Sequence, residues 1–114
     1  MTASTSACLR SCEFVPLDAI AIRSTARSFA LRVPDAAMRP LGLLPGDVAV
    51  FEHGVPPRQG DVVAALIDGA SVLRVWSVAN GRPMLRTADG TAVAVSADGL
   101  VIQGVMVQLM RARG

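Results

Sequence analysis

Short apolar runs separated by turn-forming residues dominate the chain from Phe29 onward. The runs are rich in valine, and Gly, Pro, Asp or Asn stands between most of them. Runs of this length and composition are typical of β-strands. We therefore predict a mostly β fold. Its expected strands cover residues 29–33, 47–52, 61–67, 71–78, 83–86, 91–96 and 100–110.

Asp-Gly and Asn-Gly pairs lie between the later runs. Glycine tolerates the positive φ that a two-residue type I′ turn requires, so each pair indicates a β-hairpin. We expect the second half of the chain to be an antiparallel meander. The pairs are Asp68-Gly69, Asn80-Gly81, Asp89-Gly90 and Asp98-Gly99.

The N-terminal part of the chain differs from the rest. Residues 1–12 are small, polar and rich in Ser and Thr, which predicts a flexible arm. A short extended segment starts at Glu13, and Asp18 is a suitable N-cap for one helical turn over residues 17–22. We expect one domain over residues 13–114, because a chain of 114 residues with 52% hydrophobic content is long enough to bury its own core.

Composition narrows the classes of function. The net charge is only +2 and the arginines are scattered, so we expect no direct binding of nucleic acid. The apolar runs are far shorter than the ~20 residues that cross a bilayer, which predicts a cytoplasmic protein without a membrane partner. Cys8, Cys12 and His53 fall short of a four-ligand zinc set, so we expect free thiols and no metal.

Residues 28–50, SFALRVPDAAMRPLGLLPGDVAV, have the order of the region around the nucleophile in the LexA/UmuD family of self-cleaving peptidases. In that family an apolar strand leads to a serine followed by methionine, and Gly-Asp opens the next strand. Ala37 stands at the serine position here, and Arg74 in ASVLRVW stands at the lysine position. The resemblance extends over residues 13–112. It implies a single domain of coiled antiparallel sheets like the C-terminal domain of LexA and UmuD.

The family's chemistry needs both of the replaced residues. A neutral lysine, whose pKa is lowered by burial, takes the proton of the attacking serine. Ala37 has no nucleophilic atom, and Arg74 stays protonated because guanidinium titrates above about 12. We predict a pseudoprotease without a cofactor. Two alternatives remain: Ala37 was engineered, or a hydroxyl such as Ser71, Ser24 or Ser28 acts elsewhere.

The resemblance also suggests which residues surround the cleft and which form an interface. Val33, Met38 and Trp76 are expected at the former cleft, with Trp76 either packed or in contact with a partner. The C-terminal strand is nearly all apolar, whereas a half-buried strand alternates, so both of its faces or an edge are expected to be covered. This predicts a homodimer formed through Val101, Val105 and Val107.

The chain is most similar to processed UmuD within this family. That similarity implies a homodimer that assists a Y-family translesion polymerase in the DNA-damage (SOS) response. The alternative is a regulatory pseudoprotease whose degenerate cleft holds a peptide or a partner's arm by strand addition. An active serine peptidase is a third, more distant hypothesis. No glycine precedes Gly42, so the Ala-Gly or Cys-Gly bond that the family cleaves in its N-terminal arm is lacking.

Overall fold

The computed structural model of the chain describes residues 12–16, 27–88, 90, 92–94 and 100–111. Over these residues the chain forms one antiparallel sheet in the order β1-β2-β3-β8-β4-β5-β6-β7. The mostly β prediction is confirmed. The strands are β1 Glu13–Val15, β2 Ser28–Arg32, β3 Val48–Glu52, β4 Val62–Ile67, β5 Ala70–Ala79, β6 Arg82–Arg86, β7 Ala92–Ala94 and β8 Leu100–Met110.

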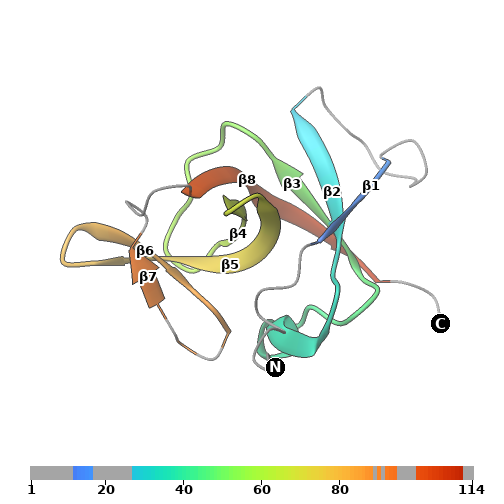
Figure 1. The fold of residues 1–114 in the computed structure, drawn as a ribbon, viewed down its shortest axis with the longest axis horizontal. Coiled ribbons are helices and arrows are strands. Elements are labelled where there is room, and N and C mark those ends of the chain that lie inside the picture. The colour runs from blue at the N-terminus through green and yellow to red at the C-terminus, as the bar shows by residue number, and fades with distance from the viewer. Residues whose placement is uncertain (1–11, 17–26, 89, 91, 95–99, 112–114) are drawn as a thin grey trace.

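Strand β8 joins the two halves of the sheet. It lies between β3 and β4, so β1, β2 and β3 form one half and β4 to β7 the other. Figure 1 shows β8 crossing the domain, with the strongly curled β5 beside β4. The meander that we expected is present from β4 to β7, but β8 leaves it and pairs with β3 and β4 instead.

Two register shifts occur along β8. Val50 faces Gln108 while Phe51 faces Met106, so Val107 is the extra residue of the first bulge. A second shift, between Ala64 and Ala65 of β4, leaves Gln103 without a directly opposed partner. A bulge bends its strand and increases the local twist, which helps this sheet to curl. Because β8 is an interior strand, its apolar composition does not mark an edge that a partner covers.

Two hairpins have the turns that the sequence predicted. Asp68 and Gly69 have φ of 50° and 84°, and Asn80 and Gly81 have φ of 53° and 77°, as type I′ turns require. The prediction of a two-residue turn at Asp89-Gly90 is wrong, because Arg86 pairs with Ala92 and residues 87–91 form a longer connection. The Asp98-Gly99 pair and the expected helical turn at 17–22 lie outside the described residues.

A 3-10 helix that the sequence analysis missed, η3 Ala36–Leu41, lies between β2 and β3. The side chain of Asp35 caps its first turn by accepting a hydrogen bond from the Ala37 amide. Gly42 ends the helix in the left-handed region, with φ of 87°, and its amide donates to the carbonyl of Arg39. An Asp and a Gly that bracket six residues were therefore a signal of this helix.

The core extends over both halves of the sheet. Leu31, Phe51 and Val63 are fully buried. Cys12, which we had assigned to the flexible arm, is only 6% exposed and packs with the cluster that contains Phe51. Its amide donates to the carbonyl of Ser71, so the ordered domain begins at least one residue earlier than predicted. The rest of the predicted arm, residues 1–11, lies outside the described residues.

Candidate functional site

A small cleft lies where η3, the end of β2, β5 and the segment after β6 meet. Its volume is about 20 Å³, roughly the space of one water molecule. Ala37 and Arg74 both line it, although they are far apart in sequence and come from different elements. The full lining is Cys12, Val33, Pro34, Asp35, Ala37, Met38, Leu73, Arg74, Thr87 and Ala88.

Arg74 occupies one wall of this cleft. It is only 7% exposed, and its Nη1 donates a hydrogen bond to the carbonyl of Leu73 at 2.7 Å. A guanidinium donates but does not accept hydrogen bonds, and it keeps its proton in proteins. Arg74 therefore supplies a fixed positive charge to the cleft and no base.

Ala37 faces the cleft from the first turn of η3. The Oδ1 atom of Asp35 accepts the Ala37 amide at 2.9 Å, whereas Oδ2 is buried without a hydrogen-bond partner among the described residues. Val33 and Met38, which we expected at the cleft, are buried and line it. No serine or lysine is among the lining residues, so the cleft lacks the residue types of a Ser-Lys dyad.

The thiol of Cys12 lies in the same cleft, which the sequence analysis did not predict. Burial raises its pKa from 9.0 to about 11, the Asp35 carboxylate adds to that increase, and Arg74 opposes it. At neutral pH the thiol is therefore protonated, and a thiolate is the form that reacts as a nucleophile. Cys12 therefore contributes packing to the cleft and no thiolate at neutral pH.

This buried thiol predicts a loss of stability at alkaline pH. The folded-state pKa of Cys12, about 11, lies above the 9.0 of the unfolded chain. The contribution to the free energy of unfolding is therefore complete below pH 9 and declines as the pH rises from 9 to 11. We expect a loss of up to about 2 kcal/mol, measured by urea denaturation across this range. The chain has no tyrosine or lysine that would add a titration there.

Substitution of each cysteine in turn shows which of the two causes the loss of stability at alkaline pH. Cys12→Ala should flatten the decline between pH 9 and 11, whereas Cys8→Ala should leave it in place. An equally steep decline in the Cys12→Ala variant would contradict this assignment.

Trp76 does not belong to the cleft, which corrects our prediction. It packs against the cluster around Val63 and Leu85 and is not among the cleft-lining residues. Arg74 and Trp76 both belong to β5, which is strongly curled (Figure 1). Ser71, another candidate hydroxyl, is buried outside the cleft lining. His53 is exposed, and its Nδ1 lies 3.3 Å from the carbonyl of Gln103.

The three valines that we predicted at the interface have different surroundings. Val101 and Val107 are 55% and 54% exposed and are available at the surface of the domain. Val105 is only 4% exposed and packs in the core with Val63. The prediction that Val105 is a surface contact is therefore wrong, because the bulges in β8 interrupt the alternation of its side chains.

Comparison with known proteins shows the family of this chain. The Peptidase S24-like family matches residues 3–107. The chain belongs to this family. Membership confirms the resemblance to the LexA/UmuD group that residues 28–50 and 70–76 suggested.

Individual relatives include LexA repressors and protein SamA. The LexA repressor of Verrucomicrobium spinosum is 40% identical over 86 residues, which cover 75% of this chain and 42% of that protein. The LexA repressor of Corynebacterium glutamicum (strain ATCC 13032) is 31% identical over 99 residues, covering 87% of this chain and 42% of the repressor. Protein SamA of Salmonella typhimurium is 39% identical over 57 residues, covering 50% of this chain and 41% of SamA. The chain thus spans less than half the length of these relatives.

None of the described helices is long and apolar enough to cross a membrane.

Proposed function

We propose that this S24-family chain is a non-catalytic, UmuD-like interaction module that takes part in the DNA-damage response. The observation that carries the proposal is the pairing of Ala37 and Arg74 in one cleft. In the family's mechanism these two positions would supply a nucleophile and a neutral base, and the side chains of Ala37 and Arg74 can supply neither. The module would then act through its surface and not through its cleft.

The size of the cleft favours this proposal over the peptide-binding alternative. The buried part of the cleft has room for little more than one water molecule, and the buried side chain of Arg74 forms part of its wall. A peptide would have to displace packed groups such as Met38, which is 5% exposed. A bound peptide would first have to disrupt the close packing around the cleft, and that loss opposes binding.

The functional partner in this proposal is a Y-family translesion polymerase. The test is affinity purification of the tagged chain from its native cells with and without DNA damage, followed by mass spectrometry. Recovery of such a polymerase, enriched after damage, would support the proposal. Recovery of a DNA-binding regulator instead, bound equally in both conditions, would favour the regulatory pseudoprotease.

Self-association through β8 is the second part of the proposal. We expect the chain to sediment as a dimer at micromolar concentration, with Val107 at the interface because it is an exposed valine on that strand. Val107→Arg should weaken the dimer by roughly 2 kcal/mol, about a thirtyfold change in the dissociation constant, if this valine is a central contact. Analytical ultracentrifugation measures the dimer dissociation constant of the parent chain and of the Val107→Arg variant.

A matched control comes from another strand. Val78 of β5 is also exposed, at 45%, and Val78→Arg should leave the dimer intact. A monomeric parent protein, or dissociation caused by Val78→Arg but not by Val107→Arg, would exclude the β8 interface. Val105 is unsuitable for this test, because a charge in the core would unfold the domain whether or not it dimerises.

A further inference from the structure

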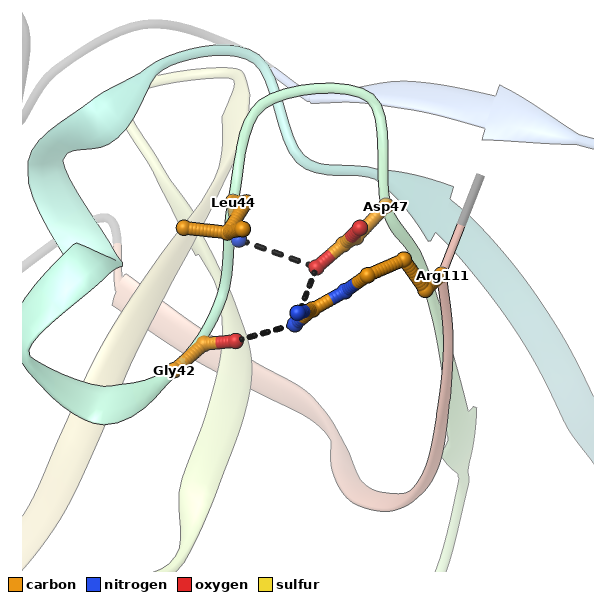
Figure 2. A network of polar contacts seen from close by, with 4 residues as sticks. All are labelled: Gly42, Leu44, Asp47 and Arg111. Carbon is orange, nitrogen blue, oxygen red and sulfur yellow. Dashed lines mark hydrogen bonds and ion pairs between the residues drawn. The ribbon is translucent and has the colours of Figure 1, made fainter. Parts of the chain in front are cut away.

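A polar network connects the end of β8 to the segment that carries the cleft. Figure 2 shows its centre, Asp47, whose side chain is only 2% exposed. Its Oδ2 accepts a hydrogen bond from the Leu44 amide at 2.9 Å and forms an ion pair with Nη2 of Arg111 at 3.2 Å. A buried carboxylate is costly unless it is hydrogen-bonded and paired, so the Leu44 amide and Arg111 together offset part of that cost.

Arg111 makes a second contact that reaches η3. The same Nη2 donates to the carbonyl of Gly42 at 2.9 Å, and Gly42 is the residue that ends η3 (Figure 2). Arg111 directly follows β8, whereas Gly42 and Asp47 flank the turn between η3 and β3. One side chain therefore joins the last strand of the chain to both ends of that turn.

The helix that Arg111 contacts is short, and its C-terminal end is closed by hydrogen bonds from the Gly42 and Leu43 amides. η3 is a 3-10 helix of six residues with Pro40 inside it, and such helices have poorer hydrogen-bond geometry than α-helices. Asp35 holds its first turn, and its last residues, including Leu41, are exposed. The contact from Arg111 thus restrains the end of η3 that the capping carboxylate does not reach.

We infer that Arg111 is a positioning residue for the cleft, through which the end of β8 fixes η3 and hence Ala37 and Met38. This role does not depend on the proposed partner or on dimer formation. Loss of Arg111 would leave the Asp47 charge buried with backbone donors only, and the turn from Gly42 to Asp47 would open to hydrate it. Opening of that turn moves η3, so the cleft should become accessible while the sheet stays folded.

Cys12 supplies a direct reporter of this opening, because its thiol lines the cleft and is almost fully buried. In a Cys8→Ser background, N-ethylmaleimide can modify only Cys12. Arg111→Gln is expected to accelerate that reaction roughly tenfold, since contacts to charged groups contribute about that factor to a local equilibrium. Arg82→Gln, at an exposed residue of β6, is the matched control and should not change the rate.

Two further measurements separate positioning from loss of global stability. If the turn opens locally, the rate for Arg111→Gln is insensitive to low urea concentrations, whereas global unfolding would make it rise steeply. Adding Asp47→Asn should restore slow modification, because a neutral amide no longer needs the cation. An unchanged rate in Arg111→Gln, a steep urea dependence, or no rescue by Asp47→Asn would overturn the inference.

Discussion

Gly104→Val is expected to lower the free energy of unfolding by about 3 kcal/mol, an effect of overpacking at the centre of the sheet. A Cβ atom at residue 104 would lie 2.8 Å and 2.9 Å from two ring atoms of Phe29, and 3.0 Å from the carbonyl oxygen of Glu52. The ring is itself fixed by stacking on Phe51, with centroids 5.5 Å apart. The β3 backbone is held between β2 and β8 and cannot move away, whereas the Phe29 ring is only partly buried and can shift at the cost of that stacking. Gly104→Ala should cost less, about 1–2 kcal/mol, measured by urea denaturation.

The source of that cost can be tested with a second substitution. Phe29→Leu removes the ring atoms nearest to residue 104 but leaves the Glu52 carbonyl, so the two changes should be partly compensating. Ala79→Val, on an exposed end of β5, adds two carbon atoms without a buried clash and should have almost no effect. Two results would contradict this explanation: no loss of stability in Gly104→Ala, or the same loss in the Phe29→Leu background. Either would show that contact with the Phe29 ring is not the cause of the destabilisation.

The local signals in the sequence were sufficient to place the strands. Valine-rich runs bounded by Asp-Gly and Asn-Gly specify where a strand ends and which way the chain turns, because those preferences act over two to four residues. The positions of β8 between β3 and β4, and of the bulges at Gln103 and Val107, depend instead on long-range pairing. The alternation of inward and outward side chains along a strand does not show where a bulge adds an extra residue. For that reason Val105 was expected at the surface and lies in the core.

The cleft was predictable where a family motif specified it and not elsewhere. Ala37 and Arg74 come together as the resemblance implied, although nothing in their local sequence pairs η3 with β5. Cys12 and Thr87 also line the cleft. Cys12 directly precedes β1 and Thr87 directly follows β6, so their places in the cleft depend on how the sheet curls. Asp35 was open to prediction as a helix cap, but its effect on the electrostatics of the cleft required the folded arrangement.

The combined Ala37→Ser and Arg74→Lys variant is expected to gain weak peptidase activity, whereas either substitution alone should be inactive. Ala37→Ser alone supplies a hydroxyl without a base, because a guanidinium has a pKa far above neutral and keeps its proton in proteins. Arg74→Lys alone supplies a base with no nucleophile to activate. Residue 74 is only 7% exposed, so desolvation should lower the pKa of the new lysine and make it a usable base.

Asp35 sets the pH at which that activity should appear. Its Oδ2 is buried in the same cleft, and a nearby carboxylate stabilises a charged lysine, which opposes the effect of desolvation on the lysine pKa. We therefore expect the double variant to be more active at alkaline than at neutral pH. Adding Asp35→Asn keeps an oxygen that can accept the amide of residue 37 but removes the charge. That triple variant should reach half-maximal activity at a lower pH than the double variant.

The assay must supply the substrate in trans, because the chain has no Ala-Gly or Cys-Gly bond before Gly42. A peptide with such a bond between apolar residues is incubated with each variant over a range of pH, and products are identified by mass spectrometry. We expect slow turnover, since the cleft is narrow and a 1 Å misplacement costs about a hundredfold in rate. Cleavage by the unmodified chain, or its own breakdown at alkaline pH, would show that a nucleophile outside residue 37 is active. Cleavage that requires both substitutions, and that shifts to lower pH with Asp35→Asn, would identify residues 37 and 74 as the former dyad.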